Sequence, residues 1–359
     1  MSISEPAGAP AVAAAPAAKP APTNRIGETM AAYKGAASTL CAGCGHDSIT
    51  SQLIKAFFEM GISPYDVAKM SGIGCSSKTT AYFMSLSHGF NGVHGRAAAI
   101  ATGSYLANRR LVHVCVSGDG DTASIGLGHF LHMLRRNLPI VYVIENNGVY
   151  GLTKGQFSAT ADKGSTHKKG FENEQTPIDC CALAIEMGCE YVARSFSGDV
   201  KQLVPLLKGA LAHGGSAVVD VVSPCVTFNN HEGSTKSLKF ARENEDPLHE
   251  VGFVPYYEPI TADYAEGTTI TIDLPDQSKL LLRKLEHDYD PRDKIRALEL
   301  CHRAQEERLF LTGLIYHSPV RGRTLAEQMN LVDEPLAHLP EERVRPAAEV
   351  LAEVMEAYR

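Results

Sequence analysis

Short apolar runs alternate along this chain with longer segments of helical pattern. Residues 111–116, 140–144 and 217–222 are almost wholly apolar, which is typical of strands buried on both faces of a parallel sheet. Residues 47–60 and 122–136 have the length and spacing of helices. The alternation predicts an α/β fold with a doubly wound, mostly parallel sheet and loops inserted between its elements.

The pattern divides the chain into three parts. Residues 1–24 are rich in Ala and Pro and cannot bury a core, so we predict a disordered tail there. Residues 25–230 carry the α/β alternation and form the predicted domain. We interpret residues 231–359 as a C-terminal extension and interface arm, with a strand-like segment at 268–274 and a final segment, 341–359, that ends in an amphipathic helix.

Composition removes several functions from consideration. The 359 residues carry a formal net charge of −7, with no basic stripe and no apolar span of about twenty residues. We therefore expect neither nucleic acid nor a membrane as a partner. Nine cysteines without a secretory signal indicate a cytoplasmic protein whose thiols stay reduced, which favours metal or redox use over disulfides.

The most informative motif is Gly118-Asp119-Gly120, followed later by Asn146-Asn147. Both clusters fall at the carboxyl ends of predicted strands, where open α/β sheets bind ligands. Mg²⁺ prefers oxygen ligands and shares phosphate oxygens with its substrate, so Asp119 and Asn147 suit a metal-bound diphosphate. The glycines would let the backbone approach the phosphates. The alternative is that both clusters are plain turns between βαβ elements.

This pair of motifs resembles the diphosphate-binding domain of thiamine diphosphate-dependent enzymes. By that resemblance the side chains of Asp119 and Asn147 and the carbonyl of Val149 bind Mg²⁺, and Thr153 contacts the diphosphate. The cofactor contacts that we expect are Gly45, His46, Ser76, Gly118, Asp119, Gly120, Asp121, Asn147, Leu152 and Thr153.

The nine cysteines fall into two groups. Five lie in apolar or apparently regular segments, where free cysteine behaves as a small hydrophobic residue; these are Cys115, Cys180, Cys181, Cys189 and Cys301. Four lie in loops rich in Gly, Ser or Pro and would complete one [4Fe–4S] cluster; these are Cys41, Cys44, Cys75 and Cys225. The Cys-x-x-Cys pair alone is weak evidence, because zinc sites and redox-active dithiols also use it.

Together these motifs resemble the β subunit of the 2-oxoacid:ferredoxin oxidoreductases, most closely those of the 2-oxoglutarate type. The resemblance spans roughly residues 35–345. Its matching segments are residues 41–46, 72–76, 94–97, 118–120 with 146–147, 151–156 and 223–229. The family commonly has Pro inside the first cysteine pair, where this chain has Ala42; the change keeps every thiol.

The resemblance implies oxidative decarboxylation of a 2-oxoacid, most closely 2-oxoglutarate, with CoA acylated and electrons passed through the cluster to ferredoxin. It also implies an α subunit that completes the thiamine site, in an αβ heterodimer or an (αβ)₂ assembly. His46 and His94 would orient the substrate or stabilise charge, and Lys78 would meet the substrate's distal carboxylate. Ordinary structural roles are the alternative for all three. A candidate ferredoxin patch, or simply a solvated loop, is formed by Lys163, Lys168 and Lys169.

Three other functions stay open. A non-redox thiamine decarboxylase or synthase would keep Asp119 and Asn147 but would have no use for four loop cysteines. A pyruvate-type or broad-specificity oxidoreductase would differ only in its substrate pocket. A zinc-stabilised, non-catalytic subunit would bind zinc without thiamine.

Overall fold

A mostly parallel sheet forms the centre of the molecule. The computed structural model describes residues 21–166, 171–228, 235–236, 245–247, 249–250, 269–273, 279–284 and 289–359. In this part the main sheet has eight strands in the order β2-β1-β3-β4-β8-β7-β13-β9. They are β1 (Val67–Ser71), β2 (His88–Asn91), β3 (Val112–Gly118), β4 (Ile140–Asn146), β7 (Tyr191–Phe196), β8 (Ala217–Val222), β9 (Glu245–Pro247) and β13 (Phe310–His317). Neighbours run parallel except β13 and β7, which are antiparallel.

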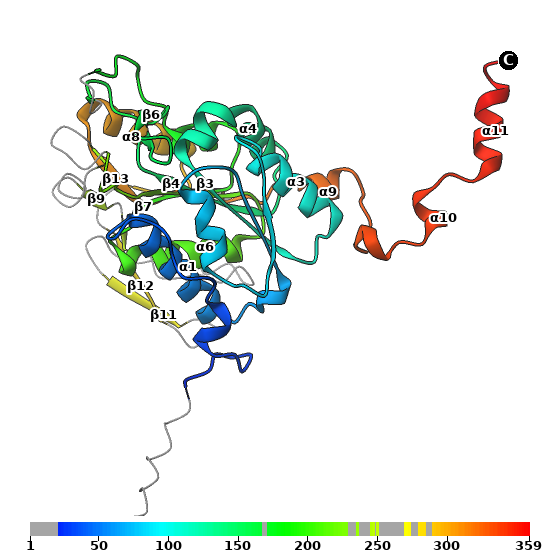
Figure 1. Ribbon diagram of the computed structural model, residues 1–359, viewed down its shortest axis with the longest axis horizontal. Helices are drawn as coiled ribbons and strands as arrows, with labels where there is room; N and C mark the ends of the chain where they lie inside the picture. The colour runs from blue at the N-terminus through cyan, green and yellow to red at the C-terminus, as the bar shows by residue number, and fades with distance from the viewer. Residues whose placement is uncertain are drawn as a thin grey trace, which may run out of the picture.

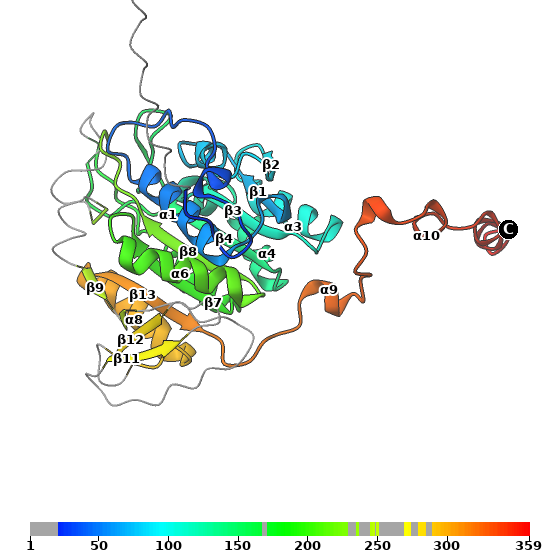
Figure 2. The ribbon, with the colours of Figure 1, turned by 90° about the horizontal axis from the view of Figure 1, so that it is seen from below.

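Helices cover both faces of this sheet, so the predicted doubly wound fold is confirmed (Figure 1 and Figure 2). One face carries α1 (Gly45–Met60) and α6 (Val200–His213), and the other carries α3 (Ala97–Ala107), α4 (Leu127–Arg135), α5 (Cys180–Glu186) and α8 (Lys294–Glu307). Successive strand residues point to opposite faces. In β3, Val114 and Val116 join the core under α1 and α6, whereas Cys115 joins the other core. Burial on both faces is the reason why the strands are continuously apolar.

The remaining elements are short. The helical turns are η1 (Met30–Tyr33), η2 (Pro64–Asp66), η3 (Ser76–Lys78), α2 (Thr79–Tyr82), η4 (Gly120–Ile125), α9 (Leu325–Gln328), η5 (Leu336–His338), α10 (Glu341–Val344) and α11 (Ala348–Glu356). Two small antiparallel sheets pair β5 (Val149–Tyr150) with β6 (Gln156–Phe157), and β12 (Lys279–Lys284) with both β10 (His249–Glu250) and β11 (Thr269–Asp273).

The three predicted apolar strands are all present. β8 has the predicted bounds, and β3 and β4 each run two residues past them, to Gly118 and Asn146. Each extension reaches into a polar motif. The sheet itself therefore fixes the backbone at the start of both motifs.

The helix predicted at 122–136 differs from the observed one. It is divided into the π-helix η4 and the α-helix α4. Asp119 already has helical backbone angles (φ −60°, ψ −41°), so the helical backbone begins directly after the strand. The amide of Gly126 donates to the carbonyl of Asp121, five residues back, at 2.9 Å, which is the wider turn of a π-helix.

The C-terminal segment 341–359 ends in a helix, α11, as predicted, and a short helix, α10, precedes it. α10 and α11 are separate, because Arg345 is extended (φ −121°, ψ 126°), as the residue before a proline prefers to be. Figure 1 shows the chain leaving the body after α9 as an arm that carries both helices. No helix in the described part is long and apolar enough to cross a membrane.

Contacts with the main body extend past the predicted domain bounds of 25–230. Asn24, which we placed in the tail, donates from its side-chain amide to Tyr33 Oη at 2.8 Å and to Phe58 O at 3.0 Å. In the predicted extension, β13 pairs with β7 in the main sheet. Residues 1–20 lie outside the described part.

A buried arginine ties three elements together on the far half of the sheet. Arg194 in β7 lies 2.7 Å (Nη2–Oδ1) from Asp179 and 2.9 Å (Nε–Oδ2) from Asp220 in β8. Asp179 also caps α5 by accepting the amides of Cys181 and Ala182. Burial by itself would raise the pKa of Asp179, but the Arg194 guanidinium outweighs this effect and holds that pKa below its usual range.

Replacing Arg194 should therefore be costly. We expect Arg194→Met to lower the free energy of unfolding by about 3–5 kcal/mol at pH 7, because the buried Asp220 and the largely buried Asp179 lose their cation. The folded-state pKa of Asp179 is depressed, so this contribution is present above the ordinary carboxyl pKa and disappears as the pH falls through the folded value. The difference in the free energy of unfolding between variant and wild type should consequently become smaller below about pH 4. Urea unfolding followed by circular dichroism measures both.

Arg345→Met is the matched control. Arg345 pairs with Glu341 at 2.7 Å, but both side chains are exposed, so its loss should change stability very little. Equal effects of the two substitutions would contradict the assignment of Arg194 as a buried tie.

Candidate active site

A cavity opens where the carboxyl ends of β1, β3 and β4 meet. It holds about 450 Å³ of empty space, part of which is open solvent at its mouth. The described residues that line it are His46, Ile73, Gly74, Cys75, Ser76, His94, Gly118, Asp119, Gly120, Asp121, Glu145, Asn147, Val149, Tyr150, Gly151, Leu152 and Thr153. The structure thus brings the two strand-end motifs to one cavity.

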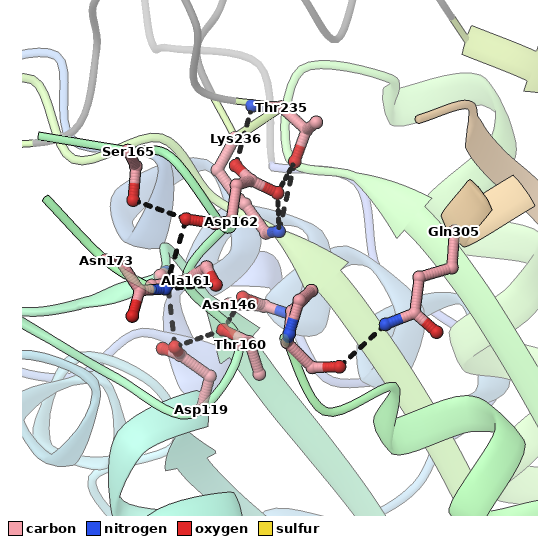
Figure 3. A network of polar contacts seen from close by, with 12 residues as sticks. Asp119, Asn146, Thr160, Ala161, Asp162, Ser165, Asn173, Thr235, Lys236 and Gln305 are labelled. Atoms are coloured by element: carbon pink, nitrogen blue, oxygen red, sulfur yellow. Dashed lines mark hydrogen bonds and ion pairs between the residues drawn. The ribbon is translucent and has the colours of Figure 1, made fainter. Parts of the chain in front are cut away.

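Asp119 is buried at this cavity, with 1% of its surface exposed. Its Oδ1 accepts the amide of Asn147 at 3.3 Å, and its Oδ2 accepts the amide of Gly148 at 3.2 Å. Two hydroxyls also donate to Oδ2, that of Thr160 at 2.6 Å (Figure 3) and that of Ser158.

All four of these donors are neutral, so they leave the charge of the carboxylate uncompensated. Burial raises the pKa of Asp119, and the hydrogen bonds from Ser158 and Thr160 offset part of that rise. A divalent cation would supply the missing positive charge and would stabilise the ionised form. The donor set therefore fits a Mg²⁺ ligand, as the sequence predicts.

The neighbouring motif residues fit the same site. The side-chain Oδ1 of Asn147 accepts the amide of Val149 at 3.1 Å, which folds the Asn147 turn back on itself. A Cβ on Gly118 would lie 3.0 Å from Ser76 Oγ, and one on Gly120 would lie 2.5 Å from the ring of Tyr150. The glycines are thus needed for close packing within the protein, in addition to any approach of a phosphate.

Asp121 acts as a brace between loops of the cavity wall. Its Oδ1 accepts the amide of Gly95 at 2.7 Å, and its Oδ2 accepts the hydroxyl of Ser117 at 3.0 Å. The amide of Ile73 also donates to Oδ1, at 3.4 Å. Gly72 leaves the space that the carboxylate fills, because a Cβ there would lie 1.8 Å from Asp121 Oδ2.

The four loop cysteines face one another beside the cavity. A Cβ on Gly151 would lie 3.5 Å from Cys75 Sγ and 3.8 Å from Cys225 Sγ, so these two thiols share one neighbour. Burial raises the pKa of Cys44 to about 12, and the nearby Cys225 and Cys75 thiols add to the rise. Burial also raises the pKa of Cys75, and the nearby Cys225 and Cys41 thiols add to that rise. Four thiols from three separate loops therefore lie near one another, and positively charged iron would stabilise their thiolate forms.

His46 is buried in a polar cluster at the inner wall. Its Nδ1 lies 2.5 Å from Ser223 Oγ and 3.6 Å from Glu145 Oε2. Burial lowers the pKa of His46 to about 4. Burial also raises the pKa of Glu145 well above its usual value, although two hydrogen bonds from Thr79 partly oppose this. At neutral pH His46 is therefore a neutral imidazole, which can orient a group by hydrogen bonding but brings no charge.

The other predicted site residues divide by position. His94, Ser76, Leu152 and Thr153 line the cavity. Gly45 and Lys78 lie outside its described lining. The positive charge of Lys78 lowers the pKa of Cys75, against the larger raising effects of burial and Cys225. In the candidate ferredoxin patch, Lys163 is exposed, and Lys168 and Lys169 lie outside the described residues.

Three residues of the site escaped the sequence analysis. They are Glu145, Ser158 and Thr160. Glu145 left a signal, since a charged residue ends an otherwise apolar strand. Ser158 and Thr160 left none, because they lie in a polar loop more than ten residues beyond Asn147 and reach Asp119 only through folding.

Comparison with known proteins first gives the class. The family model described as "Thiamine pyrophosphate enzyme, C-terminal TPP binding domain" matches residues 72–221. The cavity with Asp119 and Asn147 therefore lies in a thiamine diphosphate-binding domain, which confirms the fold type expected from the two motifs. Of the four loop cysteines, Cys75 alone lies within the matched range.

Similar whole proteins then give the family. The β subunit of 2-oxoacid:ferredoxin oxidoreductase 1 from Aeropyrum pernix is 42% identical over 230 residues, covering 64% of this chain and 70% of that protein. The 2-oxoglutarate synthase subunit KorB from Methanocaldococcus jannaschii is 36% identical over 214 residues, covering 58% and 78%. This chain belongs to the family of 2-oxoacid:ferredoxin oxidoreductase β subunits.

A solved structure agrees with this assignment. It is a 2-oxoglutarate:ferredoxin oxidoreductase from Magnetococcus marinus with 2-oxoglutarate, coenzyme A and succinyl-CoA bound. The match has a TM-score of 0.69 and 31% identity, and it covers 88% of this chain and 94% of that chain.

The brace formed by Asp121 gives a direct test of the cavity wall. We expect Gly72→Ala to lower the free energy of unfolding by about 1–3 kcal/mol, because the new methyl group displaces the Asp121 carboxylate from its buried donors. Thermal unfolding measures the loss. Gly103→Ala in α3 is the control: a Cβ there meets nothing within 4 Å, so the substitution should stabilise the helix by up to about 1 kcal/mol. If the Gly72→Ala variant were as stable as the wild type, Asp121 would not brace the cavity wall.

Proposed function

We propose that this chain is the β subunit of an enzyme that oxidatively decarboxylates 2-oxoglutarate, forms succinyl-CoA and CO₂, and passes the electrons to ferredoxin. The observation that carries the proposal is the meeting of two sites. A thiamine-type cavity with a buried Asp119 and a group of four loop cysteines share the wall that contains Cys75 and Gly151. The family to which the chain belongs, and the names of its relatives, support the same reaction.

At the diphosphate end, Asp119, Asn147 and the carbonyl of Val149 would hold Mg²⁺. Gly118 and Gly120 would let the backbone come close to the diphosphate. Thiamine diphosphate, when bound, would supply the carbanion that attacks the keto carbon and would hold the electrons that remain after CO₂ is lost. The protein's part is to hold the cofactor, to exclude water and to orient the substrate, and the neutral His46 suits that last task. His94 lines the cavity mouth and is exposed, so it is positioned to meet an incoming carboxylate.

At the cysteine end, Cys41, Cys44, Cys75 and Cys225 would hold one [4Fe–4S] cluster. Cys41 is the exposed member of the four, and the other three are partly buried. Four thiolates suit both a [4Fe–4S] cluster and the single zinc ion of the non-catalytic alternative, so metal analysis is needed to separate the two.

An α subunit would complete the enzyme. The described residues form one doubly wound sheet, and thiamine diphosphate needs a second domain for its aminopyrimidine. The partner would cover the cavity mouth, in an αβ heterodimer or an (αβ)₂ assembly. CoA and ferredoxin would bind the assembled complex, and the cytoplasmic location stays a prediction.

Removing a cluster cysteine tests the electron site. We expect Cys225→Ser to lower iron and sulfide content together and to abolish ferredoxin reduction, because a thiolate ligand is lost. Iron and acid-labile sulfide analysis, with electron paramagnetic resonance of the reduced protein, measures the change. Cys189→Ser is the control, since Cys189 is fully buried among carbonyl groups at the sheet and far from the loop.

Full iron content and normal electron transfer in the Cys225→Ser variant would remove that residue from the cluster. Zinc in place of iron, with no bound thiamine, would favour the non-catalytic alternative. Thiamine without iron would favour a non-redox decarboxylase or synthase.

Substrate choice is tested on the complex co-expressed with its α subunit. We expect turnover of 2-oxoglutarate to exceed that of pyruvate, and Lys78→Met to lower kcat/KM for 2-oxoglutarate by about 10–150-fold through loss of one charged hydrogen bond. Pyruvate has no distal carboxylate, so its kcat/KM should not change. Lys55→Met, at an exposed lysine of α1, is the matched control.

Equal losses on both substrates would show that Lys78 acts on the cluster and not on the substrate. Preference for pyruvate in the wild-type complex would favour the pyruvate-type or broad-specificity alternative. Robust decarboxylation by the isolated chain would refute the need for an α subunit.

A further inference from the structure

The loop after β6 supports the metal-binding carboxylate from behind. We propose that Ser158 and Thr160 are positioning residues that select which oxygen of Asp119 binds the metal, and that the Asp162–Lys236 ion pair holds their loop in place. The inference rests on the proposed function, because it concerns the Mg²⁺ site. Figure 3 shows the contact between Thr160 and Asp119 at one end of this loop and the contacts of Asp162 with Thr235 and Lys236 at the other.

The two oxygens of Asp119 have unequal surroundings. Oδ2 accepts three donors, the Gly148 amide at 3.2 Å, the Thr160 hydroxyl at 2.6 Å and the Ser158 hydroxyl. The described bond to Oδ1 is a longer one, from the Asn147 amide at 3.3 Å. Three donors fill the acceptor capacity of one carboxylate oxygen. The geometry therefore leaves Oδ1 as the oxygen that faces a metal.

Water cannot easily replace these hydroxyls. Thr160 is 2% exposed and Ser158 is 6% exposed. Thr160 Oγ1 also lies 2.9 Å from Asn146 Oδ1, but it has a single proton, and the charged Asp119 is the stronger acceptor. Asn146 directs its amide nitrogen to Asp220 Oδ1 at 3.1 Å. Thr160 is thus fixed between the metal site and the buried sheet.

The other end of the loop is tied to a distant part of the chain. Asp162 accepts the Thr235 amide at 2.9 Å, the Thr235 hydroxyl at 2.7 Å and Lys236 Nζ at 2.9 Å. The side-chain amide of Asn173 donates to the carbonyls of Ala161 and Asp162 at 3.0 and 3.1 Å. Residues 235–236 therefore support the loop that carries both hydroxyls.

The experiment measures metal binding directly. Mn²⁺, which gives a resonance signal when free, is titrated into the co-expressed complex with saturating thiamine diphosphate. We expect Thr160→Val to weaken Mn²⁺ binding by about 10–100-fold, because a charge-assisted hydrogen bond is lost. Thr160→Ser keeps the hydroxyl and should restore near wild-type affinity. Ser158→Ala should weaken binding in the same direction, which provides a second variant if Thr160→Val folds poorly.

Ser165→Ala is the matched control, because it removes a buried hydroxyl from the same loop. Ser165 Oγ donates to the carbonyl of Asp162 at 2.7 Å and does not contact Asp119. Its Mn²⁺ affinity should stay at the wild-type value. Loss of affinity in Ser165→Ala equal to that in Thr160→Val would overturn the proposal, since any loop damage would then suffice.

A double-mutant cycle tests the ion pair. Lys236→Met should weaken Mn²⁺ binding in the wild-type background and have little further effect when Ser158→Ala and Thr160→Val are already present, because it acts through them. If Lys236→Met weakened Mn²⁺ binding equally in both backgrounds, this part of the proposal would be overturned.

Asp119→Ala separates this proposal from the proposed function. Wild-type affinity in Thr160→Val, together with lost affinity in Asp119→Ala, would overturn the positioning role and leave the metal site intact. Unchanged affinity in Asp119→Ala would refute the metal site itself.

Discussion

The burial of one carboxylate, that of Asp119, shapes the centre of this molecule. A charge out of reach of water must be met by donors, and the described donors to Asp119 are two backbone amides and two hydroxyls, all neutral. These come from the turn after β4 and from the loop after β6, so both segments are shaped around the carboxylate. A divalent metal bound with a diphosphate would make the electrostatics of the site complete.

The cysteine group depends on the same sheet edge. Its four members come from the start of α1, the end of β1 and the end of β8, which lie far apart in sequence. Parallel strands place their carboxyl ends together, so the loops that follow them meet. Cys75 belongs to both the cysteine group and the cavity wall. Under the proposed function, electrons stored on the cofactor would therefore have a short path to the cluster.

The C-terminal part does two things in succession. It first adds to the body: β13 extends the main sheet, and the following segment is anchored where the amide of Gly322 donates to the buried Glu190 and Arg109 Nη2 donates to Leu331 O at 2.8 Å. It then leaves as the arm, whose α11 exposes apolar side chains, among them Leu351 and Met355. A nine-residue helix is only marginally stable by itself in water.

The sequence by itself determined the strands, the two motifs and the grouping of the cysteines. Each of these is written locally: a buried parallel strand must be apolar on both faces, and a ligand loop must follow it. Only the tertiary structure decided the rest. The bracing role of Asp121, the neutral state of His46 beside Glu145 and the support of Asp119 by Ser158 and Thr160 all depend on contacts between distant loops. Burial sets their protonation and hydrogen bonding, and burial is a property of the packed fold, which no local pattern of residues encodes.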